Sequence, residues 1–119
     1  MEVRNLNVQY KKGVLELCVL SILSKRDCYG YDVSELISKK IDISESTTYP
    51  ILRKLKDEGL VTTYLVEESG GPPRKYYKMT ELGKETYEKE KKEWLDFAQI
   101  VKDFLEEPGI KEKETFKHE

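Results

Sequence analysis

The chain of 119 residues is 38% hydrophobic and 37% charged, which allows one modest core and favours a soluble protein. Its formal net charge is only −2, so the chain as a whole gives no electrostatic reason to expect a polyanion such as DNA as its partner. The charge is unevenly spread, because residues 1–80 hold 13 Lys and Arg against 11 Asp and Glu, whereas residues 81–119 hold 8 against 12. The first part is therefore the better candidate for a nucleic-acid surface.

Several function classes lack the residues that they need. The two cysteines do not make a disulfide framework, and we expect a buried small hydrophobe at Cys18 and an incidental thiol at Cys28. The single histidine, His118, leaves no zinc site to assemble from Cys and His. No cofactor is expected, and the groups for the usual enzyme chemistries are missing. The apolar residues 14–23 are too few to span a bilayer, so we expect a cytoplasmic protein without a membrane partner.

The first two predicted elements are helices. Residues 14–23 are apolar almost all round, which at helical length indicates a helix that is covered on several sides. Residues 24–27 interrupt this run. Apolar residues then recur with helical spacing at Val33, Leu36, Ile37 and Ile41, which predicts a second, amphipathic helix that runs through Lys40.

The third predicted helix has recognisable signals at both ends. Ser44 or Ser46 can cap its first N–H groups, and Pro50 lies near enough to its start to cost little. Gly59 suits the left-handed residue that follows a last turn, with Leu60 folding back onto the helix. The residues expected to pack inward are Thr48, Ile51, Leu52 and Leu55.

From residue 61 the period of the pattern changes from helical to two. Residues 61–66 and 75–79 are rich in β-branched and aromatic residues, and residues 67–73 between them are turn formers, which predicts a β-hairpin. Thr80 can cap a last helix over residues 81–107, and a disordered tail is expected at 108–119. The order predicts a mainly α fold with a small β-hairpin: a winged helix-turn-helix domain over residues 1–80, followed by one long C-terminal dimerisation helix.

The outward face of the third helix carries polar residues suited to DNA. Ser46, Tyr49 and Arg53 lie opposite the apolar face, with Thr47 and Lys54 beside them. Arginine can bond a guanine edge with two hydrogen bonds, and hydroxyl groups can bond phosphates or bases. The N-terminal part of this helix enters the major groove in helix-turn-helix proteins. An ordinary solvated helix would look similar, so this helix alone does not decide the function.

The hairpin supplies an independent indication. Arg74 and Lys75 directly follow its glycine- and proline-rich tip, where they can reach phosphates or the minor groove beside the helix. Two separate elements with the same chemistry favour DNA binding. Tyr29 or Tyr31, near the start of the second helix, can bond phosphate or lie in the core. The alternative function is a winged-helix module that contacts an acidic protein and has no sequence-specific DNA binding.

Three motifs occur in the order and at the separations of a known family: Tyr29-Gly30-Tyr31-Asp32-Val33, the run from Thr48 to Val61, and the run from Gly71 to Gly83. With them, the chain resembles the PadR family of transcriptional regulators over about residues 10–107. The resemblance implies a dimeric winged-helix repressor that binds double-stranded DNA and releases its operator when an effector, often a phenolic or drug-like compound, binds. It further implies the short subgroup of multidrug-sensing repressors, in which a tryptophan of the last helix lines a pore at the dimer centre.

The last helix carries residues for two roles. Trp94 matches the position of the pore tryptophan, whereas Phe97 and Ala98 depart from the resemblance, which implies more polar residues there. These three residues form the candidate effector site. Residues recurring at seven-residue intervals form the predicted dimer interface, namely Tyr87, Trp94 and Val101 together with Phe97 and Phe104. Dimer packing alone and packing combined with an effector role for Trp94 both remain open.

The sequence thus predicts a PadR-like transcriptional regulator, a repressor, that binds an inverted-repeat operator as a homodimer and is released by a small aromatic effector. The two third helices would enter successive major grooves about 34–36 Å apart. Groove contacts are expected from Ser46, Thr47, Tyr49 and Arg53, and backbone or minor-groove contacts from Lys54, Arg74 and Lys75.

Overall fold

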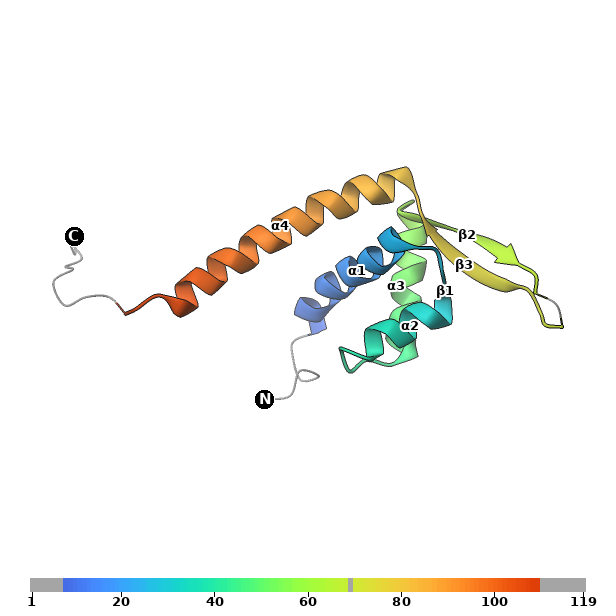
Figure 1. Cartoon of the computed structure of the whole chain (residues 1–119), viewed down its shortest axis with the longest axis horizontal. Coiled ribbons are helices and arrows are strands. Elements are labelled where there is room, and N and C mark those ends of the chain that lie inside the picture. Colours follow the sequence, from blue (N-terminus) through green and yellow to red (C-terminus); the bar gives the residue numbers. More distant parts are fainter. Residues whose placement is uncertain (1–7, 69, 110–119) are drawn as a thin grey trace.

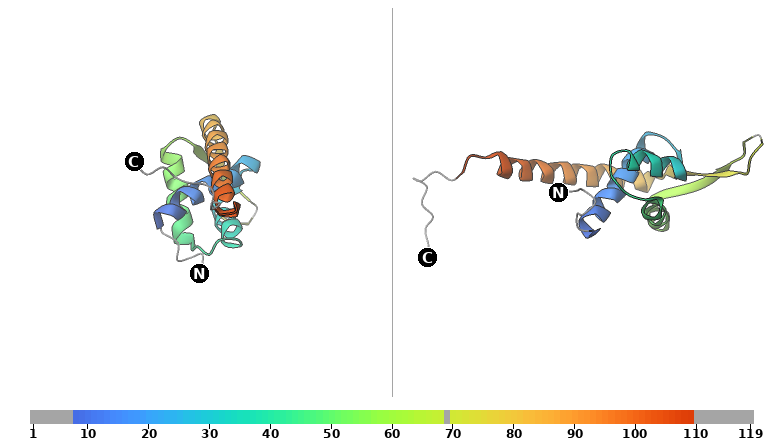
Figure 2. Two further views of the ribbon diagram at one scale, coloured as in Figure 1. Left: turned by 90° about the vertical axis from the view of Figure 1, so that its left-hand side faces the viewer. Right: turned by 90° about the horizontal axis from the view of Figure 1, so that it is seen from below.

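A computed structural model describes residues 8–68 and 70–109 of the chain (Figure 1). The elements follow one another as α1 (Val8–Lys25), β1 (Cys28–Tyr29), α2 (Gly30–Ser38), α3 (Glu45–Asp57), β2 (Val61–Val66), β3 (Arg74–Met79) and α4 (Glu81–Glu106). Helices α1, α2 and α3 form a body from which the β2–β3 hairpin and α4 project in opposite directions (Figures 1 and 2). The predicted order of three helices, a hairpin and a long last helix is confirmed.

The ends of the first two helices differ from the prediction. Helix α1 begins at Val8, before the apolar run, and α2 ends at Ser38 instead of Lys40. After α2 the Lys40 N–H donates to the carbonyl oxygen of Ile37 at 3.0 Å, so the chain tightens into a turn there. Apolar spacing indicates which face of a helix is buried, but helix ends depend on such local hydrogen bonds.

The sheet has one strand more than the predicted hairpin. Its order is β1-β3-β2, and all pairs are antiparallel. Cys28 pairs with Tyr77 and Tyr29 with Tyr76, so the short segment before α2 lies along the free edge of β3. A strand of two residues is too short to give a period, which is why the sequence predicts no strand between the first two helices.

The core surrounds α1, which contacts α2, α3, α4 and β3. This agrees with the prediction of a helix covered on several sides. The expected roles of the cysteines are wrong, because Cys28 is buried with 2% exposure, whereas Cys18 is only partly covered. Burial raises the pKa of both thiols, so both stay protonated at neutral pH.

Helix α3 begins and ends near the predicted residues. Ser44 is the N-cap, but its side chain caps no backbone N–H, since its hydroxyl bonds the hydroxyl of Ser46 at 2.5 Å. Pro50 lies inside α3, further from the start than expected. At the other end Gly59 has a φ of 77°, and the Leu60 N–H donates to the carbonyl oxygen of Leu55 at 2.9 Å, as predicted.

Helix α4 is fixed to the body at its first turn. Thr80 accepts a hydrogen bond from the Gly83 N–H at 3.0 Å and donates one to the carbonyl oxygen of Gly59 at 2.7 Å. The cap therefore also ties α4 to the turn that follows α3. One turn further on, Tyr87 is buried with 7% exposure, and its hydroxyl donates to Ser21 Oγ of α1 at 3.3 Å.

The position of Tyr87 bears on its predicted place in the dimer interface. The side chain packs inside its own chain against α1, so it offers little surface to a second copy. The C-terminal part of α4 projects away from the body (Figure 1). The predicted domain boundary at residue 80 coincides with the N-cap of α4.

Gly83→Ala is expected to lower the free energy of unfolding by at least about 3 kcal/mol. A Cβ at this position would overlap the Leu60 carbonyl oxygen and lie 3.0 Å from Met79 Cγ, and the backbone atom cannot move aside as a side chain would. Urea unfolding followed by circular dichroism measures the change. Gly71→Ala is the control, because a Cβ there meets nothing within 4 Å. Equal stability of the two variants would contradict the close approach of α4 to Leu60.

Two further observations concern the described part of the chain. Its helices include none whose length and apolar character would suit a membrane crossing. Within the same residues, no three His, Cys, Asp or Glu side chains gather into a group that could hold a metal ion. The predicted tail at 108–119, with His118, lies outside the described residues except for its first two positions.

Candidate nucleic-acid interface

The two faces of α3 are as predicted. Thr48, Leu52 and Leu55 are almost completely buried, with exposures of 0%, 0% and 1%. The opposite face is exposed, and it carries Ser46, Tyr49, Pro50, Arg53, Lys56 and Asp57, whereas Thr47 is partly covered. Helical spacing of the apolar residues is sufficient to orient these polar side chains toward solvent.

The exposed face of α3 borders a cleft that the hairpin completes. This cleft has a volume of about 540 Å³ and lies between α3, the start of α2 and β3. It brings Arg53 and Lys75 together, although they come from separate elements of the sequence. The full lining is Tyr29, Gly30, Tyr49, Arg53, Lys56, Asp57, Lys75 and Tyr77. Three cations against one carboxylate make the cleft suitable for an anionic partner.

Gly30 allows the tyrosines of the cleft to pack closely. A Cβ at this position would lie 3.0 Å from Tyr49 Cε1 and 3.3 Å from Tyr77 Cε1, so a larger residue would push the Tyr49 ring. Burial raises the pKa of Tyr49 and of Tyr77, so both phenols are hydrogen-bond donors at neutral pH. Gly30 and Tyr77 were not among the predicted site residues. The alternation of β3 could have indicated Tyr77, since it lies two residues after Lys75.

Arg74 and Lys75 of the hairpin have different surroundings. Lys75 lines the cleft beside α3, while the Arg74 guanidinium lies over the Tyr29 ring, 5.0 Å from its centroid. Successive residues of a strand point to opposite faces of a sheet, which explains the difference. Tyr31 is 42% exposed and its ring contacts Tyr29 at a centroid distance of 6.4 Å. Tyr29 is only partly buried, so neither tyrosine is a core residue.

Lys54, the next residue after Arg53, forms an ion pair within the chain. Its Nζ donates to Glu16 Oε1 of α1 at 2.8 Å and to Oε2 at 2.9 Å, and Glu58 lies 3.6 Å away. The hydrogen bond to Glu16 raises the pKa of Lys54. A phosphate that binds Lys54, as predicted, would therefore compete with the Glu16 carboxylate, which already pairs with this cation.

Glu16→Gln and Lys54→Gln are each expected to destabilise the fold slightly, with a coupling of up to about 1 kcal/mol between them. The folded-state pKa of Lys54 lies above its ordinary value, so this contribution is complete at neutral pH and is lost as the pH rises through the raised pKa. A double-mutant cycle in urea at pH 7 and above pH 11 measures it. The exposed Lys92–Asp96 pair of α4 is the control, and equal coupling in both pairs would contradict a distinct role for Lys54.

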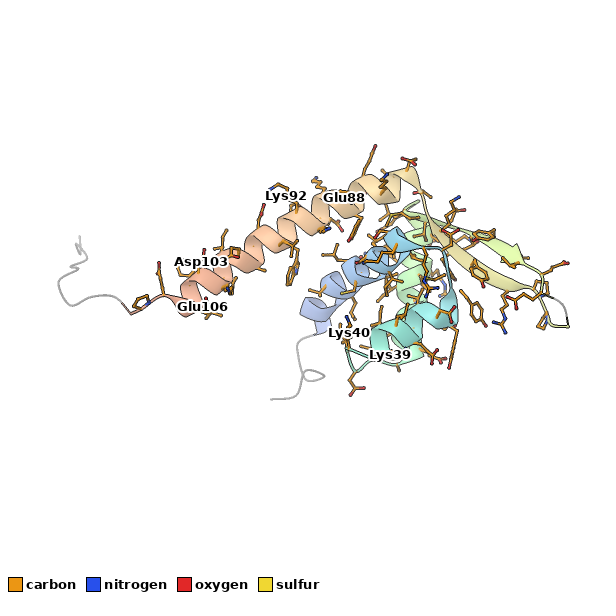
Figure 3. All side chains as sticks on the ribbon, in the orientation of Figure 1. Lys39, Lys40, Glu88, Lys92, Asp103 and Glu106 are labelled. Atoms are coloured by element: carbon orange, nitrogen blue, oxygen red, sulfur yellow. The ribbon has the colours of Figure 1, made fainter. Side chains whose placement is uncertain are left out.

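The part of α4 beyond Tyr87 exposes a strip of large apolar side chains. Their exposures are 40% for Trp94, 63% for Phe97, 38% for Val101, 75% for Phe104 and 80% for Leu105, and Ala98 is partly covered. Charged side chains such as Glu88 and Lys92 point away from the body on the outer side of the helix (Figure 3). Contiguous exposed apolar surface of this kind marks an interaction site.

Comparisons with known proteins found a matching family model and similar solved structures. The model of the transcriptional regulator PadR-like family matches residues 19–89. A solved PadR-like transcriptional regulator from Bacillus cereus strain ATCC 14579 is 37% identical with a TM-score of 0.76, covering 84% of this chain and 99% of that chain. A solved protein of Streptococcus mutans UA159 is 39% identical with a TM-score of 0.75, covering 80% and 89%. The negative transcriptional regulator PadR of Bacillus subtilis is 30% identical over 86 residues, which are 69% of this chain but only 45% of that longer protein.

Proposed function

Because the chain belongs to the PadR-like family of transcriptional regulators, which are not enzymes, we propose that it is a repressor that binds an inverted-repeat operator as a homodimer. The observation that carries this proposal is the cleft that Arg53 of α3 and Lys75 of the hairpin both line. One continuous cationic surface on two elements matches a groove and the phosphates beside it.

The DNA contacts follow from the order of residues along α3. Its N-terminal part enters the major groove, where Ser46, Thr47 and Tyr49 contact phosphates or base edges and Arg53 bonds a guanine. Lys75 neutralises a phosphate from the hairpin, and Arg74 reaches the backbone or the minor groove. Lys54 stays with Glu16 and contributes to the fold instead.

The second copy of the chain is the partner for the apolar strip of α4. Trp94, Phe97, Val101 and Phe104 recur with heptad spacing on the projecting part of this helix, which suits antiparallel or parallel packing against another helix. The helix has 26 residues and, at about 1.5 Å per residue, a length of roughly 39 Å. In such a dimer the length of the two projecting α4 helices sets the distance between the two α3 helices. The two-fold axis of the dimer requires an inverted repeat in the DNA.

The effector proposal concerns the same strip. Trp94, Phe97 and Ala98 are the residues that we propose for an aromatic effector, and all three lie on the surface that the dimer would cover. A bound effector would therefore change the packing of the two helices and, through them, the spacing of the DNA-binding surfaces.

Selection of duplexes from a random pool by the full chain tests the proposal. We expect enrichment of inverted repeats whose half-sites lie about one helical turn apart, and an affinity that falls as the salt concentration rises. A duplex with a single half-site is the matched control and should bind far more weakly. Repression is measured by placing the selected site between a promoter and a reporter gene. Unenriched pools combined with salt-independent binding would favour the alternative of a protein-binding module.

A further inference from the structure

A row of three tyrosines crosses the sheet near the middle of β3. Tyr29 of β1 pairs with Tyr76 of β3, and Tyr76 pairs with Tyr64 of β2, so the three residues lie directly opposite one another. The ring centroids are 6.2 Å apart for Tyr29 and Tyr76, and 5.8 Å apart for Tyr76 and Tyr64. Aromatic pairs at such distances stabilise neighbouring strands beyond their buried area.

Each end of this tyrosine row is attached to a charged side chain. At the β2 end, the Tyr64 hydroxyl donates to Asp27 Oδ2 at 2.7 Å, which ties the residue before β1 to the far strand of the sheet. This hydrogen bond raises the pKa of Tyr64, so the hydroxyl remains a donor across the neutral range. At the β1 end, the Arg74 guanidinium lies over the Tyr29 ring.

The contact between Arg74 and Tyr29 connects the hairpin to the start of α2. Arg74 stands two residues before Tyr76 in β3 and therefore points to the same face of the sheet, where the Tyr29 ring is within reach. Tyr29 is followed directly by α2, which begins at Gly30. A long, exposed arginine would otherwise sample many rotamers, and a flat ring beneath its planar guanidinium limits them.

We propose that Tyr29 is a positioning residue for Arg74: the tyrosine row holds the Tyr29 ring in place, and the ring holds the guanidinium where it meets the DNA backbone. This inference rests on the proposed function. It replaces the predicted phosphate contact of the Tyr29 hydroxyl by a role of the ring. A positioned arginine loses less conformational entropy on binding than a free one, so the contact increases affinity without touching DNA itself.

A double-mutant cycle on the operator duplex tests the inference. Arg74→Ala is expected to weaken binding about fivefold. It should also reduce the salt slope, which is the slope of log binding constant against log salt concentration, by about one unit. Tyr29→Leu should weaken binding about threefold, the scale of an exposed cation–π contact, while Tyr29→Phe, which keeps the ring, should bind like the original chain. Adding Tyr29→Leu to Arg74→Ala should cause no further loss.

Two outcomes would overturn the inference: additive losses in the double variant, or an equal loss in Tyr29→Phe and Tyr29→Leu, which would assign the role to the hydroxyl. Arg74→Lys provides a second measurement that does not alter Tyr29. It keeps the charge but not the planar group, so it should lose about threefold in the original chain and nothing in Tyr29→Leu. The proposed function fails separately, if the original chain itself has no salt-dependent affinity for any selected duplex.

Discussion

Arg53→Ala is expected to weaken binding to the operator by about 1–3 kcal/mol and to relax the sequence preference at one base pair of each half-site. The side chain is exposed on α3 and lines the cleft that the hairpin closes. A guanidinium that bonds both acceptors of a guanine edge discriminates against the other base pairs, and alanine removes that discrimination. Repeating the duplex selection with the variant, and measuring affinities for single-base changes, detects the loss.

Lys75→Ala is the informative contrast to Arg53→Ala. A lysine that contacts a phosphate does not discriminate between base pairs. Its loss should therefore weaken binding to all duplexes alike and reduce the salt slope by about one unit. Lys92→Ala removes the same charge from the outer side of α4 and should change neither quantity (Figure 3). If Arg53→Ala and Lys92→Ala bind the operator equally well, the exposed face of α3 does not contact the bases.

The faces of α3 could be predicted from the sequence because a helix of this length repeats its period several times. Buried and exposed residues therefore separate without knowledge of the rest of the fold. That Arg53 and Lys75 line one cleft could not be predicted in the same way. It depends on β1, a strand of two residues that holds β3 beside α2, and such a short strand has no detectable period.

Two of the predicted site residues have partners within the chain that the sequence does not indicate. Lys54 has the sequence environment of a free surface cation, yet its partner Glu16 lies 38 residues away in the chain. Tyr87 has the heptad spacing of Trp94, yet α1 covers the first and leaves the second 40% exposed. Local spacing indicates the direction of a side chain, whereas tertiary packing decides whether a partner within the chain is already there.

Because α1 covers the first turns of α4, the proposed dimer surface begins beyond Tyr87, and the last prediction concerns that surface. Phe104→Glu is expected to raise the dissociation constant of the dimer by a factor of about 10²–10⁴, since burying one phenylalanine is worth about 1.5–3 kcal/mol and a two-fold dimer contains the change twice. Phe97→Glu should act in the same direction. Sedimentation equilibrium at micromolar concentration measures the mass against the 14.0 kDa of one chain.

Gln99→Glu introduces the same charge on the opposite side of α4 and should leave the dimer intact, apart from the loss of its hydrogen bond to Asp103. Operator affinity provides the link to function. When the two α4 helices separate, each chain binds its half-site independently. Phe104→Glu should therefore weaken binding to the inverted repeat and leave the weak binding to a single half-site unchanged. A change at both duplexes would mean that the substitution disturbs the DNA-binding domain itself, and a dimer that survives Phe104→Glu would place its interface elsewhere on the chain.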